Sequence, residues 1–193
     1  MLKRERNPLF SPAMRWAVSL FTFALLQPAS GNANCAASDA AQVSQVLARG
    51  IELNERFKRS VKAVDESAYQ RLRKKNERYG EETAIPCAQK ASELLDRSVD
   101  EALLHQLIEF TLSMDNSADE RVSEVMASVF ANHPDAVAAA LAKLSHSRAK
   151  VLLRSIESGW PTVKRTLEPA TRQEREARLK ALRAAQAPST STR

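Results

Sequence analysis

The chain has 193 residues, of which 44% are hydrophobic and 27% are charged, and its formal net charge is +6. This length suits one domain, and the composition suits a soluble domain with a hydrophobic core. With 4 glycines and 5% aromatic residues, β-sandwiches and β-barrels are disfavoured, because these folds need glycine turns and aromatic strands. Neither GxGxxG nor GxxxxGK[ST] occurs, so the usual phosphate-binding loops are excluded.

Residues 1–33 have the pattern of an export signal. Basic residues precede an uncharged apolar run, 16–26 (WAVSLFTFALL), which is short for a membrane span of about 20 residues. Small side chains at the −3 and −1 positions predict cleavage before Asn34. We therefore expect a periplasmic or secreted protein with no integral membrane span after cleavage. A start at Met14 and an uncleaved, anchoring leader are the alternatives that stay open.

Cys35 and Cys87 are the only cysteines, and an even count in an exported chain predicts one disulfide. Nucleophilic and metal-binding roles fit less well, because there is no CxxC pair and no cluster of ligands nearby. Residues 39–79 have a largely helical spacing of apolar side chains. A single straight helix would hold the two cysteines roughly 60 Å apart, so a hairpin is required.

We expect this N-terminal hairpin to consist of antiparallel helices near 38–63 and 67–79, closed at its open end by the disulfide. Gly80 has the position of a glycine that ends a helix. The stretch 81–86 is then expected to be extended, which makes up for the shorter second helix.

Further helices are expected along the rest of the chain, each preceded by a capping residue or proline. Their expected starts are Pro86, Ser98, Ser117, Pro134 and Ser147. Loops of two to four residues between helices predict antiparallel neighbours. The fold class is therefore all-α, a compact array of antiparallel helices, with Gly159 and Pro161 ending the packed region.

The expected organisation is a signal peptide at 1–33, an all-helical domain at 34–161 and a basic extension at 162–193. In the extension, a capping box at Thr171 predicts a charged helix to about Gln186, followed by a disordered end. Residues 34–80 and 162–193 are net basic, whereas 81–161 are net acidic. The extension could therefore lie on the acidic middle or bind an acidic partner.

No catalytic or metal-binding pattern is found: GxSxG, HExxH and SxxK are all absent. Glu101, His105 and Glu109 share one helix face, but the apolar residues point the other way, so we interpret the three as surface residues. The alternative enzyme is a small envelope hydrolase acting on peptidoglycan glycan, which needs two carboxylates. Its nominal candidates are Glu81, Glu82, Glu109 and Glu124. We expect no cofactor.

Basic side chains cluster in the second helix of the hairpin, at Arg71, Arg73, Lys74, Lys75 and Arg78. This cluster is the candidate partner-binding face, suited to an envelope protein or an anionic surface. Nucleic acid is disfavoured, because aromatic residues do not alternate with the charges and the compartment is wrong. The sequence therefore favours an exported accessory or interaction protein of the cell envelope over an enzyme.

Overall fold

The computed structural model describes residues 35–60, 65–114 and 120–186, and every regular element in these ranges is helical. The predicted all-α fold is confirmed. The expected signal peptide and Ser117 lie outside the described residues. In chain order the α-helices are α1 (Ala40–Ser60), α2 (Glu66–Tyr79), α3 (Ile85–Arg97), α4 (Glu101–Ser113), α5 (Glu120–Asn132), α6 (Pro134–Lys143), α7 (His146–Val163) and α8 (Pro169–Ala185).

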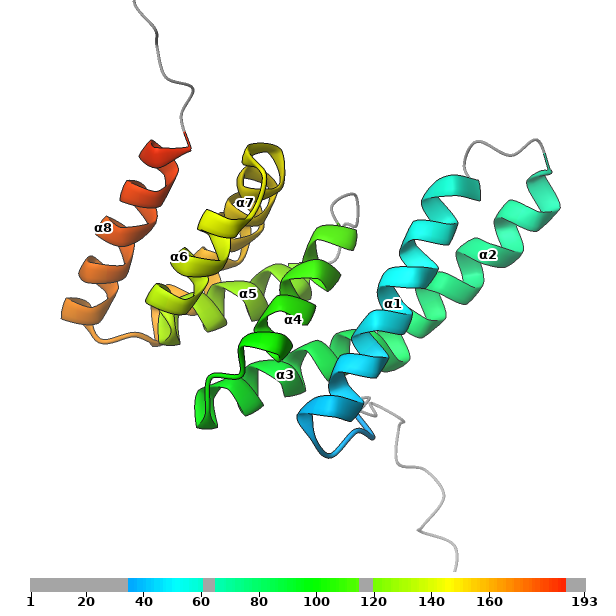
Figure 1. The fold of residues 1–193 in the computed structure, drawn as a ribbon, viewed down its shortest axis with the longest axis horizontal. Helices are drawn as coiled ribbons and strands as arrows, with labels where there is room; N and C mark the ends of the chain where they lie inside the picture. The colour runs from blue at the N-terminus through cyan, green and yellow to red at the C-terminus, as the bar shows by residue number, and fades with distance from the viewer. Residues whose placement is uncertain (1–34, 61–64, 115–119, 187–193) are drawn as a thin grey trace, which may run out of the picture. The chain divides into compact units, whose positions relative to one another are not determined.

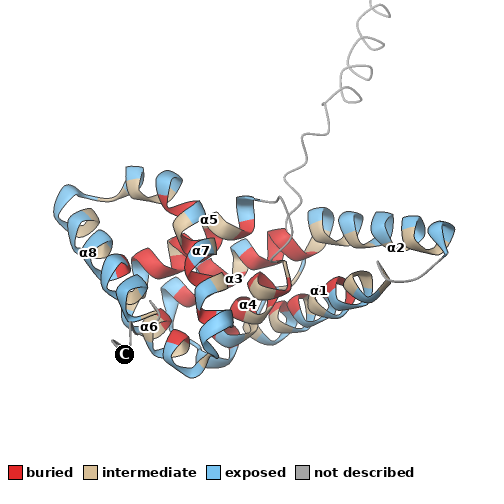
Figure 2. Ribbon diagram, turned by 90° about the horizontal axis from the view of Figure 1, so that it is seen from above, coloured by how far each residue is buried: buried red, intermediate tan, exposed pale blue. Residues whose placement is uncertain are grey.

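Within this part of the chain, the helices pack as neighbours around one core (Figure 1). Helices α1 and α2 lie side by side at one end, and α8 lies against α6 at the other. Helices α3, α4, α5 and α7 lie between them and bury most of the large apolar side chains (Figure 2). Phe110 and Phe130 are the bulkiest of the fully buried side chains.

Residues 66–97 form one helical run with a π turn in its middle. Helix α2 continues through the π-helix η2 (Gly80–Ala84) directly into α3. The expectations that Gly80 ends the helix and that 81–86 is extended are therefore wrong. Gly80 keeps right-handed backbone angles (φ −55°, ψ −58°), and its N–H donates to carbonyls one turn back. A glycine ends a helix in this way only when it is left-handed.

The N-terminal hairpin and its disulfide are present as predicted. Helix α1 packs along the helical run, and Cys35 is bonded to Cys87 in α3 with their Cα atoms 4.7 Å apart. At 1.5 Å per residue, α1 is about 32 Å long and the stretch from 66 to Cys87 about 33 Å. The two sides of the hairpin have nearly the same length because η2 is helical. A bond across 52 residues stabilises the fold by roughly 4 kcal/mol in the chain-entropy model.

The starts of two helices are shifted from their predicted positions. Asp100, and not Ser98, caps α4: its carboxylate accepts from the N–H groups of Ala102 and Leu103 at 2.9 and 3.0 Å. Helix α7 follows Ser145 rather than Ser147. Each cap is the last residue with extended backbone angles, and neighbouring polar residues offer the same side-chain chemistry. Composition alone therefore leaves the choice between them open.

Gly159 and Pro161 do not end α7 as expected, because the helix runs on to Val163. Pro161 lies inside it, where it removes one hydrogen bond without ending the helix. The neighbouring Trp160 is only 6% exposed and packs edge-on against Phe130, with ring centroids 5.9 Å apart. Its Nε1 donates to Glu176 Oε1 of α8 at 3.3 Å. These contacts hold the last turn in place.

The expected helix of the C-terminal extension is present as α8, but it begins at Pro169 rather than at a Thr171 cap. Leu179 is the buried residue of this helix. Arg175 Nε donates to the carbonyl of Ala131, at the C-terminal end of α5, at 2.8 Å. The basic helix is thus attached by the buried Leu179, the partly buried Leu182 and several polar contacts.

Helices α5 and α7 approach each other closely at Gly159, which is buried. A Cβ atom at Gly159 would lie 2.2 Å from the carbonyl oxygen of Ser123 and 2.6 Å from the backbone nitrogen of Glu124. These are backbone atoms, so they cannot rotate away. Beside this contact, the hydroxyls of Ser123 and Ser155 are 3.1 Å apart. Only glycine allows this helix crossing.

Gly159→Ala is therefore expected to lower the free energy of unfolding by about 1–3 kcal/mol, as overpacked core positions do. Gly80→Ala is the matched control, because a Cβ there meets nothing within 4 Å and the backbone is already right-handed. It should raise stability by up to about 1 kcal/mol. Urea unfolding of both variants measures the two effects, and equal effects would contradict the assigned packing at Gly159.

Candidate partner-binding face and groove

Helices α1 and α2 form an arm, which we define as residues 40–60 and 65–79. None of the residues of α2 is buried, and Figure 2 shows exposed and half-buried stretches alternating along this helix. Asp65 caps the helix by accepting from the N–H groups of Ser67 and Ala68. Its hydrogen bond with the Ser67 hydroxyl lowers the pKa of Asp65. The helix therefore has its own capping residue but little buried surface.

Two aromatic side chains attach α2 to α1. Tyr69 stacks on Phe57, with ring centroids 5.4 Å apart. Tyr79 Oη donates to the carbonyl of Val46 at 3.1 Å, and desolvation by burial raises the pKa of this tyrosine. These contacts use one face of α2 and leave the other faces to solvent.

Four of the five predicted basic residues lie together on an exposed face of α2. At 100° per residue, Arg71, Lys74, Lys75 and Arg78 fall within about 100° of the helix circumference, and all four are exposed. We call them the basic stripe. Arg78 Nε donates to Glu82 Oε2 at 2.9 Å. Lys74 and Lys75 form no ion pair with any described residue.

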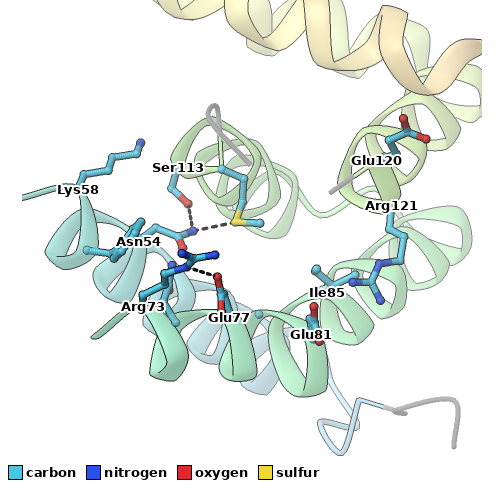
Figure 3. Close-up of a pocket in the computed structure, with 13 residues that line it drawn as sticks. Asn54, Lys58, Arg73, Glu77, Glu81, Ile85, Ser113, Glu120 and Arg121 are labelled. Carbon is cyan, nitrogen blue, oxygen red and sulfur yellow. Dashed lines mark hydrogen bonds and ion pairs between the residues drawn. The ribbon is translucent and has the colours of Figure 1, made fainter. Parts of the chain in front are cut away.

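The fifth predicted residue, Arg73, lies elsewhere on α2, roughly 150° around the helix from the centre of the stripe. Its Nε donates to Glu77 Oε1 at 2.7 Å, and this hydrogen bond raises the pKa of Arg73. The pair lies at the edge of a groove, as Figure 3 shows. The structure thus divides the predicted face into an exposed stripe and a groove residue.

This groove, which we call the arm groove, has a volume of about 820 Å³. Its walls come from α1, α2, η2 and the start of α3 on one side, and from the end of α4 and the start of α5 on the other (Figure 3). The apolar part of the lining consists of Phe57, Ile85 and Met114. Such a mixture of apolar surface and a few polar groups is typical of binding sites.

Together with Ser113, Asn54 is one of two buried polar residues in the described lining of the arm groove, with 7% of its surface exposed. Its Nδ2 donates to Ser113 Oγ at 2.8 Å and to Met114 Sδ at 3.0 Å. Ser113 Oγ donates its own proton to the carbonyl of Phe110 at 2.6 Å, so it can only accept from Asn54. This chain of donors fixes the amide orientation, and no described residue donates to Asn54 Oδ1.

The charged groups of the arm groove differ in whether they have partners. Arg73 is paired with Glu77, and Lys58 Nζ lies 3.3 Å from Glu55 Oε1. In contrast, Glu81 and Glu120 are exposed and form no ion pair with any described residue. Arg121, next to Glu120 on α5, also lines the groove, so its described lining holds three basic and three acidic side chains.

A second pocket, of about 510 Å³, lies where the corner between α5 and α6 meets α8. Asp96 accepts hydrogen bonds there from Asn132 Nδ2 at 2.9 Å and lies 3.0 Å from His133 Nε2. Arg178 pairs with Asp135. Because these charges already satisfy one another, this pocket offers less to a ligand than the arm groove.

Of the residues considered for metal binding, His105 Nε2 lies 3.7 Å from Glu109 Oε1, whereas Glu101 lies 3.8 Å from Lys143 Nζ. His105 is exposed, and Glu109 is held by Arg148 at 2.5 Å. Within the described ranges, no group of three or more His, Cys, Asp or Glu side chains could hold a metal ion. Of the remaining glutamates, Glu82 pairs with Arg78, whereas Glu124 is half-buried on α5.

The polar cluster of Asn54, Ser113 and Met114 was not predicted from the sequence. One signal was available: Leu47, Gly50, Leu53 and Asn54 lie at the spacing of a buried helix face, so a polar residue interrupts that face. Its partner in α4 is 59 residues away, and no local pattern indicates that pairing.

Comparisons with protein-family models, with curated proteins and with solved structures found no match to this chain. None of the helices in the described ranges is both long and apolar enough to cross a membrane.

Tyr79→Phe should lower the free energy of unfolding by about 1 kcal/mol at pH 7, because the hydrogen bond to Val46 is lost. Burial raises the pKa of Tyr79 in the folded protein. Tyr79 therefore stabilises the folded protein fully at pH values below about 10, the pKa of tyrosine in the unfolded chain. This stabilisation is lost as the pH rises through the higher pKa of Tyr79 in the folded protein. The difference between wild type and variant should therefore narrow at high pH.

Urea unfolding between pH 7 and pH 11 measures this difference. Tyr69→Phe is the control, since the Tyr69 hydroxyl makes no hydrogen bond with a described residue. A difference that stays constant across the range would show that Tyr79 is not held as described.

Proposed function

We propose that the protein is an exported helical accessory protein of the cell envelope, and that it binds an anionic partner through the basic stripe of α2. The observation that carries this proposal is the character of α2, a helix of 14 residues that buries none of them. Such a helix contributes little to the core. Its basic residues are instead available to a partner.

The charges of the stripe support this function. Lys74 and Lys75 have no ion pair with a described residue, and among these residues Arg71 donates only to the Ser67 hydroxyl. Of the four stripe residues, Arg78 is paired with Glu82, whereas the charges of Arg71, Lys74 and Lys75 form no ion pair with any described residue. A face of one sign steers and holds a partner of the opposite sign.

The export signal supports the compartment. The basic region, the short apolar run and the small residues before Asn34 have the order of a cleaved signal, and an exported protein with a disulfide is typical of an oxidising compartment. No observation favours the alternative, a peptidoglycan hydrolase, because two of its nominal carboxylates, Glu82 and Glu109, are held in ion pairs.

Export is tested by the intact mass of the protein recovered from the periplasm. The expected mass is that of residues 34–193 with two hydrogens fewer, and alkylation of the cysteines is expected only after reduction. A full-length mass with two free thiols would contradict both export and oxidation in that compartment.

Binding is tested by reversing the three least-paired charges of the stripe with Arg71→Glu, Lys74→Glu and Lys75→Glu. Each basic residue near an anionic surface contributes about 1 kcal/mol, so the triple variant should bind about 100-fold more weakly. The probes are polyglutamate and phosphatidylglycerol vesicles, with phosphatidylcholine vesicles as the neutral reference. Glutamate is a good helix former, so α2 should stay folded.

The matched control makes the same charge change outside the arm, with Lys150→Glu, Arg154→Glu and Lys180→Glu. These three residues are exposed and form no ion pair with any described residue. If the control loses as much affinity as the stripe variant, net charge alone explains binding and the proposal fails.

A further inference from the structure

We infer that α8 is a strap that opens and closes on the rest of the helical domain, and that ion pairs hold it closed. Rising ionic strength releases α8 and uncovers Trp160. The strap is separate from the basic stripe of α2, so it goes beyond the proposed function. Three observations support it: the small apolar contact of α8, the exposed ion pairs around that contact and the position of Trp160.

The apolar contact of α8 is small for a helix of 17 residues. Leu179 is its buried residue, and Leu182 is half-buried against the core. Figure 2 shows the other positions of this helix exposed or half-buried. By comparison, the buried residues of α7 are Ala149, Leu152, Leu153, Ile156, Gly159 and Trp160. Because the free energy of burial scales with apolar area, apolar contact holds α8 much more weakly than α7.

Charged side chains flank this apolar contact and join α8 to the net-acidic middle of the chain. Arg178 pairs with Asp135 at the start of α6, and Arg183 Nη1 lies 3.5 Å from Glu157 Oε1 in α7. At 100° per residue, Arg178, Leu179 and Arg183 fall within about 140° of the circumference of α8. Each of the four paired side chains is 30% to 86% exposed, so salt can screen both pairs.

The closed position of α8 is also opposed by one unfavourable contact. Arg172 Nε is buried and has no hydrogen-bond partner among the described residues, and a buried donor without a partner is unfavourable. Arg175 Nε donates to the Ala131 carbonyl at 2.8 Å, but water replaces that acceptor when α8 moves away. All residues of α8 after Thr171 are good helix formers. Release therefore costs little, and the ion pairs decide between the two positions.

Trp160 lies at the contact with α8 and reports its position. Its Nε1 donates to Glu176 Oε1 at 3.3 Å, its ring packs against Phe130, and 6% of its surface is exposed. Lys164 Nζ lies 3.8 Å from the same oxygen of Glu176. Opening of α8 removes Glu176 and exposes the indole edge to water. Because the chain from residue 34 onward contains no other tryptophan, its fluorescence comes from Trp160 alone.

The test uses the oxidised chain from residue 34 to residue 193, which contains every described residue. Raising NaCl from about 10 mM to about 300 mM shortens the Debye length from about 30 Å to less than about 10 Å. We expect Trp160 emission to shift to longer wavelength at the higher concentration. Hydrogen exchange should become about five- to tenfold faster in peptides from 169–186, because a released helix frays, and should stay unchanged in α5 and α7.

Two results of this experiment would overturn the inference. The first is an emission wavelength and an exchange rate of 169–186 that do not depend on salt. The second is faster exchange in α7 together with α8, because salt would then be unfolding the core rather than opening the strap.

Two double variants test the ion pairs themselves. Arg178→Gln with Arg183→Gln should favour the open position about tenfold in low salt and reduce the salt dependence, since an exposed pair contributes up to about fivefold. The matched control, Lys150→Gln with Lys180→Gln, removes the same charge from exposed residues that form no ion pair with any described residue. It should leave Trp160 emission unchanged. Equal shifts in the two variants would show that net charge, and not pairing, controls α8.

Leu179→Ala separates opening of α8 from unfolding of the core. It removes the buried side chain of the strap, keeps a good helix former at this position and leaves both ion pairs in place. Trp160 should then be exposed already in low salt, while peptides from α5 and α7 keep their slow exchange. Loss of slow exchange in α5 and α7 would show that α8 is an integral part of the core, which would overturn the inference.

Discussion

The covalent bond between Cys35 and Cys87 sets the register of the N-terminal half. It ties the start of α1 to the part of the helical run that belongs to the core. Because α1 is a rigid rod, this attachment also determines which of its residues meet α4, far from the bond itself. In this arrangement Asn54 reaches Ser113, and both residues line the arm groove.

The continuous helix from 66 to 97 gives the arm its two different halves. Its α3 half is held by buried residues on either side of Cys87, whereas its α2 half has none. Segments with little buried apolar surface open at lower free energy than the core. A binding face on the arm therefore takes least from the stability of the core. The π turn at Gly80–Ala84 lies at the boundary between the two halves. Such π turns are frequent at functional sites.

The two candidate binding features differ in how far local sequence could reveal them. The basic stripe could be recognised because its residues are close together in one helix and need no partner to be identified. Even so, a cluster in sequence is not yet a face: Arg73 is separated from the stripe by helix geometry and is paired with Glu77. The arm groove could not be recognised in this way, since its walls come from helices that are far apart in the chain.

By itself, the sequence determined that the chain is helical, that Cys35 pairs with Cys87 and that α2 is basic. These properties depend on apolar periodicity, on the count of cysteines and on composition, all of which are local or additive. Only the tertiary structure decided which of several competing helix ends is used. Gly80 and Pro161 are ordinary end signals, yet packing against neighbouring helices keeps both inside helices. Long-range contacts outweigh these signals because each local signal amounts to only about 1–3 kcal/mol.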